Sequence, residues 1–388
     1  MKNKNVLMLV YSHYPSDTRV RKEALTLNKN GFKVDIVCLR KEGQKKTEIF
    51  EGIKVYRINL SKQRKGLFSY LFLYLSFFFL SAIKVNALFI KEKYAYIHIH
   101  NMPNFLVFTS IIPKLFGSKI ILDMHDPMPE LLGSVLSSEN QYLKKLLTIE
   151  EKISISFVDK VITTNIAFKE LFISRGCPEQ KITIIMNSPY PEIFDKVQTK
   201  IRKDNNFFIL YNGSIVKRHG LDLLIDAINL LVYKIPNIRL KIYGDGEFLN
   251  EIIRKIKDLN LENYITYCGA VLVDDILAEI TECDLGVIPN RFNEFTNLNF
   301  PIRVFEFIHF KKPVIVPRTK GIQDYFSEDS IFYFEPDNIE NLANLIYSIY
   351  TKKLEVEKLI EKSFNIYKKN IWDIQAKNLI KVYNENHI

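Results

Sequence analysis

Short apolar segments alternate with longer amphipathic segments along most of the chain. In the first half, the short segments are rich in Val, Ile and aromatic residues, which is typical of buried β-strands, and they cover residues 5–11, 33–39, 95–100, 119–125, 160–165 and 182–187. Stretches with the apolar spacing of helices, such as residues 19–31, separate them. This alternation predicts an α/β fold with a doubly wound parallel sheet.

A polar, proline-bearing stretch at residues 186–206 interrupts the alternation, which then restarts. Further strands are predicted at residues 207–213, 238–244, 264–269, 284–289, 312–316 and 331–334. A length of 388 residues also suggests two domains, because single cores rarely grow beyond about 250–300 residues. We therefore predict two Rossmann-like domains that face one another across a cleft, residues 1–190 and residues 191–371.

Composition and charge narrow the class of protein only a little. Hydrophobic residues make up 47% of the chain, so a sizeable core can be buried, and the net charge of +10 suits nucleic acid, an anionic membrane or a phosphorylated substrate. The four cysteines lie far apart without a CxxC pair, which argues against a cysteine zinc site and for a reducing compartment. The apolar run at the N-terminus is too short for a signal peptide, so a cytoplasmic protein is predicted.

One uncharged segment is an argument for contact with a membrane instead of a purely cytoplasmic location. Residues 67–83 carry no charge, which is the lower edge of the length that spans a membrane, and a basic run at residues 62–65 precedes them. Three interpretations stay open: a buried helix packed on a sheet, a helix lying partly in a membrane interface, or a true span. The first is favoured, and a true span is the least favoured, because it would cut through the middle of a folding unit.

The first candidate for chemistry is a small-residue turn after a buried strand. Gly213 and Ser214 follow the strand that ends at Tyr211, and Arg218 and His219 stand just before a long helix. Free backbone N–H groups at a helix start, together with these cations, form a site for an anion such as a diphosphate. A solvated basic loop is an equally good interpretation of the same residues.

A second candidate lies in a largely apolar stretch, residues 295–316. Pro301 and Ile302 precede a predicted helix in which Arg303 and Glu306 share one face. A simple ion pair would explain them, but they also suit separate partners, a phosphate for the arginine and a ribose diol for the carboxylate. The chain has no GxGxxG, Walker or GxSxG motif, which argues against a dinucleotide oxidoreductase, a P-loop NTPase and a serine hydrolase.

The first half offers three histidines at strand ends. His98 and His100 alternate on one strand and therefore share a face, but no third ligand follows at usable spacing, so no metal site is predicted. His125 ends another strand, where it could orient a sugar hydroxyl or a leaving phosphate. A helix-capping or core histidine is the alternative.

The order of these motifs resembles the family 4 retaining glycosyltransferases of GT-B fold, in a version common in cell-surface polysaccharide assembly. The resemblance rests on "HYPSDTRVRKEALTLNKNGFKVDIVCLR", "IHIHN", "ILDMHD", "NGSIVKRHGLDLLIDAI", "IYGDGE", "YCGAV" and "FTNLNFPIRVFEFIHFKKPVIV". It also implies that the terminal helix, residues 372–388, crosses back to the N-terminal domain.

The resemblance assigns roles residue by residue. Glu306 would bind the donor ribose, Arg218 and Arg303 would face the diphosphate, and His125 would lie near the transferred sugar. Three further parts of the donor site match. Gly213 and Ser214 form the turn before the first helix of the second half, and Ala270 and Val271 form the strip that holds the nucleobase. The residues flanking the two arginines are His219, Pro301 and Ile302.

Some positions depart from the family pattern. The usual first acid, eight residues before Glu306, is Leu298, so its contact with the sugar must come from elsewhere, with Asn297 and Asn299 as candidates. The usual lysine before the glycine is His219. These changes leave the identity of the sugar open more than they affect the fold.

We therefore predict a metal-independent retaining hexosyltransferase. The donor is a nucleotide diphosphate sugar, UDP-sugar favoured over GDP-sugar, with no other cofactor, and the acceptor is a glycan or polyprenyl-linked glycan. Peripheral contact with an anionic membrane, on the inner face of the plasma membrane, is a further expectation, and nucleic acid is not expected as a partner. A nucleotide-sugar 2-epimerase of GT-B fold and a non-catalytic GT-B partner subunit remain alternatives.

Overall fold

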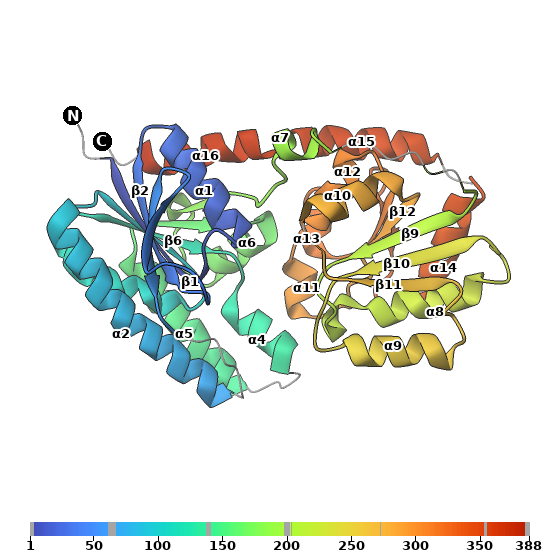
Figure 1. Cartoon of the computed structure of the whole chain (residues 1–388), viewed down its shortest axis with the longest axis horizontal. Helices are drawn as coiled ribbons and strands as arrows, with labels where there is room; N and C mark the ends of the chain where they lie inside the picture. The colour runs from blue at the N-terminus through green and yellow to red at the C-terminus, as the bar shows by residue number, and fades with distance from the viewer. Residues whose placement is uncertain are drawn as a thin grey trace. The chain divides into compact units, whose positions relative to one another are not determined.

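The computed structural model describes residues 4–60, 67–136, 141–197, 202, 204–271, 273–352 and 355–384 (Figure 1). The chain forms two compact units, Met1–Asn187 with Gln375–Ile388, and Ser188–Ile374. The sequence placed the corresponding boundaries after residues 190 and 371. We refer to these two compact units, in the order given, as unit 1 and unit 2.

Unit 1 is built on a sheet in which the described residues contribute eight strands, in the order β3-β4-β2-β1-β5-β6-β7-β8. All neighbours are parallel except β3 and β4, which form an antiparallel hairpin that the sequence analysis did not predict. The strands are β1 (Asn5–His13), β2 (Lys33–Leu39), β3 (Thr47–Phe50), β4 (Ile53–Ile58), β5 (Tyr96–His100), β6 (Lys119–Met124), β7 (Lys160–Thr163) and β8 (Ile182–Ile184).

Helices connect these strands. They are α1 (Thr18–Lys29), α2 (Leu67–Glu92), the 3₁₀ helix η1 (Asn104–Ser110), α3 (Ile111–Leu115), α4 (Met128–Leu136), α5 (Gln141–Phe157), α6 (Ile166–Ser174) and the short η2 (Glu179–Lys181). The first shows the local logic: the Asp17 side chain caps α1 by accepting from the Val20 N–H, and Val20, Ala24 and Leu27 bury one face of the helix on the sheet.

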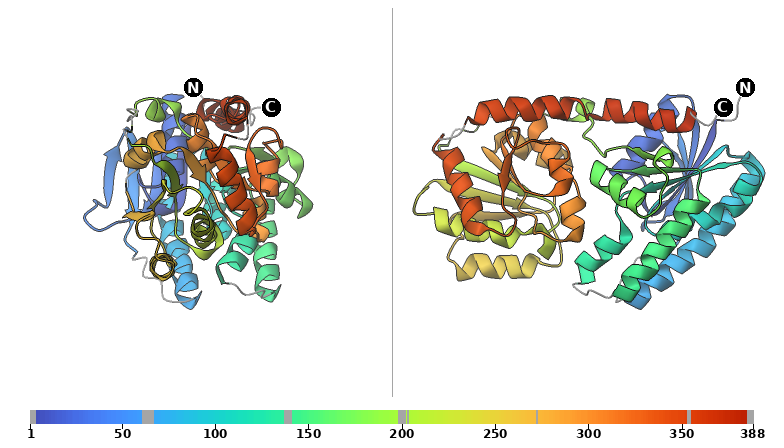
Figure 2. Two further views of the ribbon diagram at one scale, coloured as in Figure 1. Left: turned by 90° about the vertical axis from the view of Figure 1, so that its right-hand side faces the viewer. Right: turned by 180° about the vertical axis from the view of Figure 1, so that it is seen from behind.

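Helix α2 packs on unit 1 through a narrow inner stripe. Leu73, Phe77, Val85 and Leu88, spaced three or four residues apart or at multiples of this spacing, are buried. Figures 1 and 2 show α2 along one side of the unit, and η1 packs against both α2 and α5. Among the described residues, one helical segment, Leu71–Glu92, is long and apolar enough to cross a membrane by length and composition, with a mean hydropathy of 1.8.

The last helix, α16 (Trp372–Asn384), returns to the N-terminal sheet. Its Tyr383 is fully buried, and its ring lies 4.9 Å from that of Tyr96 and 5.3 Å from that of Phe32. The Tyr96 hydroxyl donates to the Tyr383 carbonyl at 2.5 Å. These contacts confirm the predicted return of the C-terminal helix to the N-terminal domain.

Unit 2 contains a second sheet, with six described strands in the order β11-β10-β9-β12-β13-β14, all of them parallel. The strands are β9 (Phe207–Asn212), β10 (Ile238–Tyr243), β11 (Ile265–Gly269), β12 (Leu285–Val287), β13 (Val314–Pro317) and β14 (Phe332–Phe334). The helices are α7 (Pro191–Phe194), η3 (Lys217–His219), α8 (Leu221–Leu231), α9 (Leu249–Asp258), α10 (Val273–Glu282), α11 (Glu294–Leu298), α12 (Arg303–His309), α13 (Lys320–Gln323), α14 (Ile339–Tyr350) and α15 (Val356–Lys368).

Close packing of α12 on this sheet depends on a glycine. The Phe307 ring of α12 lies where a Cβ on Gly286 of β12 would be, with the nearest ring carbon 2.5 Å from that position. Any side chain at residue 286 would therefore push α12 away from β12. Val304, Phe305, Phe307 and Ile308 of α12 are buried, so this helix is fixed in the core.

The predicted fold class is confirmed: both halves are parallel α/β sheets covered by helices. Each of the twelve strands predicted from the apolar segments overlaps a strand of the structure. Strand β3 alternates exposed and half-buried residues, and the charged residues Lys54 and Arg57 interrupt the apolar run of β4, so neither strand shows the continuous apolar run on which strand prediction depended.

Candidate functional site

Strand order in unit 2 marks the end of β9 as the natural ligand position. The chain leaves β9 toward β10 and β11 on one side, and later returns to β12, β13 and β14 on the other. Ligands of open α/β sheets bind at such a switch point, outside the carboxyl ends of the strands. The residues at the end of β9 are Asn212 and Gly213.

Gly213 lets an arginine lie directly on the backbone of this turn. Its φ is 141°, and a Cβ built on it would lie 2.4 Å from Nη1 of Arg303. Nη1 of Arg303 donates a hydrogen bond to the Asn212 carbonyl. The guanidinium also lies over the Tyr211 ring, 5.5 Å from its centroid. A residue with a side chain at position 213 would displace this cation.

Asn212 also contacts the acid of the same helix. Its Nδ2 donates to Oε2 of Glu306 at 3.1 Å, while its backbone carbonyl accepts from Arg303. Asn212 is buried, and its Oδ1 has no hydrogen-bond partner among the described residues. Arg303 and Glu306 of α12 are therefore both contacted by one asparagine at the end of β9.

His219 joins the same group from the other side of the turn. Its Nδ1–H donates to the Ser214 carbonyl at 2.8 Å. Burial, followed by the positive charges of Arg303 and Arg218, lowers the pKa of His219 to about 3. The imidazole is therefore neutral at physiological pH, and the positive charge of this region resides on the arginines.

Glycine turns continue this edge of the sheet toward β11. Gly244 has a φ of 144°, and a Cβ on it would lie 1.9 Å from the Gly213 carbonyl oxygen. The Gly244 N–H donates to the Gly269 carbonyl at 2.9 Å. Ala270 and Val271, the predicted nucleobase strip, follow Gly269 and are exposed to solvent. This edge is therefore a continuous run of backbone with few side chains over it.

The region before α12 contains the departures from the family pattern. Asn293 begins α11 in a capping box with Thr296, and the helix ends at Leu298. Leu298 and Asn299 are half buried. Oδ1 of Asn297 accepts from the Lys320 N–H at 3.1 Å, so this oxygen holds the start of α13. Pro301 is buried and Ile302 is half buried beside α12.

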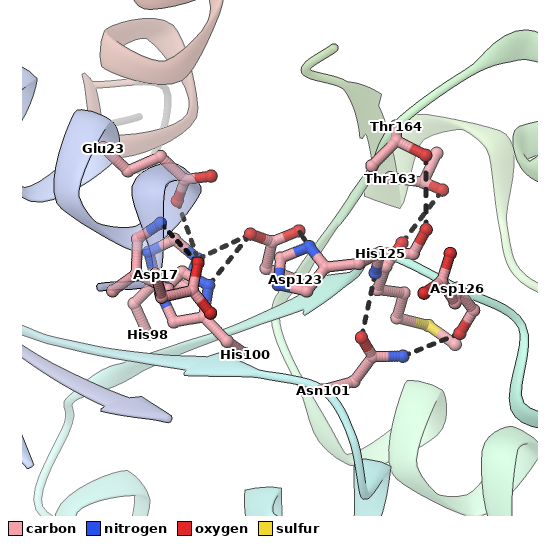
Figure 3. Close-up of polar contacts among 12 residues, drawn as sticks. Asp17, Glu23, His98, His100, Asn101, Asp123, His125, Asp126, Thr163 and Thr164 are labelled. Atoms are coloured by element: carbon pink, nitrogen blue, oxygen red, sulfur yellow. Dashed lines mark hydrogen bonds and ion pairs between the residues drawn. The ribbon is translucent and has the colours of Figure 1, made fainter. Parts of the chain in front are cut away.

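A second group of polar side chains lies in unit 1, at the carboxyl ends of β5 and β6 (Figure 3). His125 is buried, and its Nδ1 lies 3.1 Å from Oδ1 of Asp123. Its backbone N–H donates to Oδ1 of Asn101 at 3.0 Å, and its carbonyl accepts from the Thr164 hydroxyl at 3.3 Å. Burial and the charge of Arg19 lower the pKa of His125.

Asp123 is the centre of this group. His100 Nδ1 lies 3.1 Å from its Oδ2, and His98 Nε2 lies 3.8 Å from the same oxygen. Oε2 of Glu23, from α1, lies 3.7 Å from His98 Nε2. Burial raises the pKa of Asp123, but the adjacent histidines lower it more, so the carboxylate is ionised. Burial lowers the pKa of His100 to about 3.

Unit 2 thus brings together most of the sequence-predicted donor residues. Arg303, Glu306, Gly213 and Ser214 meet at the end of β9 through direct contacts or shared partners, His219 bonds to the same turn, and the charge of Arg218 acts on His219. His125 lies in unit 1, in a separate cluster of polar residues. Sequence reasoning missed four residues that position these groups: Tyr211, Asn212, Gly244 and Glu23. A polar residue ending an apolar strand was the one available signal for Asn212.

The fold places the chain in a known class. Sucrose-phosphate synthase from Thermosynechococcus elongatus has the same architecture, with a TM-score of 0.80, 17% identity and 98% coverage of both chains. HepE of Anabaena, solved in complex with UDP-glucose, matches with a TM-score of 0.73 at 16% identity over 98% of this chain and 99% of that one. The two α/β units therefore form a GT-B fold.

Sequence comparison gives the family. The family model described as Glycosyltransferase Family 4 matches residues 17–188, and the model described as Glycosyl transferases group 1 matches residues 193–365. An uncharacterized glycosyltransferase of Methanocaldococcus jannaschii is 24% identical over 318 residues, which cover 76% of this chain and 87% of that protein. The chain belongs to glycosyltransferase family 4 and is a glycosyltransferase.

The electrostatics of the β9 turn predict how His219 titrates. In the wild type, its NMR signals should not titrate between about pH 8 and about pH 5, because its pKa lies near 3. Arg303→Gln removes one of the charges that lower this pKa, so the pKa should rise toward the ordinary value. Because the folded-state pKa lies below the unfolded one, unit 2 should lose stability as the pH falls from about 6.5, and the variant should lose less. A wild-type His219 titrating near 6.5 would contradict this account.

Proposed function

We propose that this glycosyltransferase moves a hexose-type sugar from a nucleotide diphosphate donor to a glycan or lipid-linked glycan, with retention of anomeric configuration. The cluster around Asn212 carries the proposal. It holds a cation, Arg303, and a carboxylate, Glu306, at the switch point of the unit 2 sheet. A phosphate and a ribose diol are the two ends of one ligand that these groups fit.

The diphosphate is the leaving group in this mechanism. Its charge increases as the bond to the sugar breaks, and Arg303 and Arg218 are the groups proposed to stabilise it. Neutral His219 adds no charge, but its hydrogen bond to the Ser214 carbonyl holds the turn beside the arginines. With two cations in this role, no metal ion is needed to bridge the phosphates.

The transferred sugar has its own proposed contact, in unit 1. His125 is assigned to the transferred sugar, where its imidazole can hydrogen-bond a hydroxyl group. We propose no enzymic nucleophile. Attack on the same face as the departing phosphate, which takes the acceptor's proton, gives retention and requires mainly positioning of the reactants.

A uridine nucleotide is the favoured donor base. HepE of Anabaena, which shares the fold, was solved with UDP-glucose. Ala270 and Val271 form an exposed strip after β11, where backbone groups rather than large side chains are available to a base. Leu298 stands where family members have an acid, so we expect the choice of sugar to be decided near this residue.

A thermal-shift panel of UDP, GDP and their sugars tests the donor assignment, because a ligand that binds the folded state stabilises it by mass action. UDP compounds should raise the unfolding temperature most. Glu306→Gln should weaken UDP binding about tenfold, because hydrogen bonds to a charged group contribute roughly 1.5–3 kcal/mol. Glu340→Gln, an exposed acid on α14 in the same unit, is the matched control and should not change affinity.

Product analysis then separates transfer from its rivals. A transferase releases free nucleotide diphosphate only with acceptor present, and the product keeps the anomeric configuration of the donor. An isomerised nucleotide sugar formed without acceptor would instead identify an epimerase. Absence of nucleotide binding and of transfer would leave a non-catalytic subunit and refute the proposal.

We also propose that unit 1 contacts an anionic membrane where a lipid-linked acceptor is held. The outer face of α2 is apolar along its length: Phe72, Phe79, Ile83 and Ile90 are 69%, 63%, 71% and 71% exposed. An apolar outer face is unusual for a helix covering a sheet, because this face normally meets water. The inner stripe of α2 is buried in the unit, which favours a helix lying in the interface over a span.

The neighbouring helix α3 extends this surface, and α5 of the same unit carries further exposed apolar residues. Ile112, Leu115 and Phe116, in α3 and just after it, are exposed, and the Phe116 ring lies 6.2 Å from Phe89 of α2. On α5, Leu146 and Ile149 are exposed beside a shallow cavity of about 370 Å³ that contains three lysines, and its lining is Gln141, Lys144, Lys145, Thr148, Ile149 and Lys152. Apolar residues mixed with lysines suit an anionic lipid surface.

Vesicle flotation tests this contact. The protein should float with vesicles rich in anionic phosphatidylglycerol at low salt, and the double variant Phe79→Ser, Ile83→Ser should lose most of this binding while keeping its fold. Ile49→Ser, a 73% exposed isoleucine on β3 of the same unit, is the matched control and should float like the wild type. Neutralising Lys62, Arg64 and Lys65, which lie outside the described residues, should weaken flotation at low salt. Equal flotation of all variants would refute the proposed surface.

A further inference from the structure

We propose that Glu23, His98, His100 and Asp123 bind one divalent transition-metal ion, with zinc as the best fit (Figure 3). The sequence analysis predicted no metal, because the His98–His100 pair had no third ligand nearby in the chain. The fold supplies two: Asp123 from the adjacent strand β6, and Glu23 from helix α1. This inference concerns unit 1 and does not rest on the proposed transfer reaction.

The spacing of the four groups is close to that of a tetrahedral site. One ligand atom from each residue can be chosen so that all four lie within 4.8 Å of one another. Three of the separations are 3.1, 3.7 and 3.8 Å, between Asp123 Oδ2 and His100 Nδ1, Glu23 Oε2 and His98 Nε2, and Asp123 Oδ2 and His98 Nε2. Ligand atoms about 2.0–2.1 Å from a tetrahedral zinc ion lie roughly 3.3 Å apart, so small movements complete the site.

The polar atoms at this site lack protein partners. Among the described residues, Glu23 Oε2, His98 Nε2 and His100 Nε2 are buried and make no hydrogen bond. The side chains of His98, His100, Asp123 and Glu23 are 0–2% exposed. Unsatisfied buried polar atoms are costly, and two of these, Glu23 Oε2 and His98 Nε2, lie 3.7 Å apart, which indicates a missing partner between them. A metal ion there would satisfy both, with Asp123 Oδ2 and His100 Nδ1 as the other two ligands.

Second contacts orient two of the ligands. His98 Nδ1 is hydrogen-bonded to the Tyr383 hydroxyl at 2.8 Å, so its Nε2 is left to face Glu23 and Asp123. Asp123 Oδ1 lies 3.1 Å from His125 Nδ1, while Oδ2 faces the other two histidines. Metal-binding histidines and carboxylates usually have such outer partners, which fix their orientation.

The charge of the cluster also favours a bound cation. Two carboxylates lie in a site closed to water, and the guanidinium of Arg19, which acts on Glu23, also acts on Asp17 and therefore does not balance both buried acids. Either a proton resides on Glu23 or a divalent cation binds between the two acids. Imidazole nitrogens and carboxylate oxygens are both ligands that zinc accepts. Such an ion would link α1, β5 and β6, and the free energy of its binding would contribute to the stability of the fold.

Metal analysis of protein purified without a histidine tag tests the proposal. Elemental analysis by mass spectrometry should find about one zinc per wild-type chain after gel filtration. His98→Gln and Glu23→Gln should each lose most of this zinc. His13→Gln, a half-buried histidine of the same unit outside the cluster, should retain it. Circular dichroism would confirm that each variant is folded.

Cobalt provides a readout that needs no variant. Wild-type protein refolded with one equivalent of Co²⁺ should show the intense visible bands of a four-coordinate ion, and Zn²⁺ should abolish them. A wild type that binds neither ion after refolding would refute the site and leave a proton on Glu23 as the balancing charge. Zinc retained by His98→Gln would refute it as well, because the metal would then lie elsewhere.

Discussion

The proposed donor site depends on one close approach, the contact of the Arg303 guanidinium with the backbone at the end of β9. This contact exists because Gly213 has no Cβ, and because the Asn212 carbonyl at this strand end accepts a hydrogen bond. The same asparagine reaches Glu306 with its side chain. Arg303 and Glu306 are thereby fixed at the switch point of the unit 2 sheet. From the sequence alone they could have been a minor surface ion pair. Burial of four α12 side chains and the tight contact between Gly286 and Phe307 keep this helix in place.

The two units solve the problem of buried charge in different ways. In unit 2, burial and the two arginines keep His219 neutral, so the positive charge near the β9 turn belongs to groups that remain cations at any physiological pH. In unit 1, Asp123 and Glu23 are buried among histidines, and the positive charge of Arg19, which acts on Glu23, also acts on Asp17. The first arrangement suits a ligand with negative charge, and the second suits a bound cation.

The architecture could be predicted from the sequence, because each buried parallel strand is a continuous run of apolar residues. Sequence reasoning also found Arg303, Glu306 and the Gly213–Ser214 turn, which stand out as polar or small residues beside apolar segments. It missed Asn212 because one asparagine at a strand end carries no periodic signal. It missed Glu23 because this residue lies about 75 positions before its histidine neighbours, and only the packing of α1 on β5 and β6 brings them together. The apolar outer face of α2 was equally hidden: the sequence showed an apolar helix, but not which side would be covered.

The central claim is that the Arg303 contact with the β9 turn forms the diphosphate end of a nucleotide site. Calorimetry with UDP and with uridine, on the wild type and on Arg303→Gln, tests it most directly. The account predicts that the variant loses roughly tenfold or more in UDP affinity and little or nothing for uridine, because only UDP carries the charge that the guanidinium binds. Arg318→Gln, which removes a half-buried ion-pairing arginine of the same unit, should bind both ligands normally. An equal loss of affinity for UDP and uridine in Arg303→Gln, or no loss for either, would contradict the account.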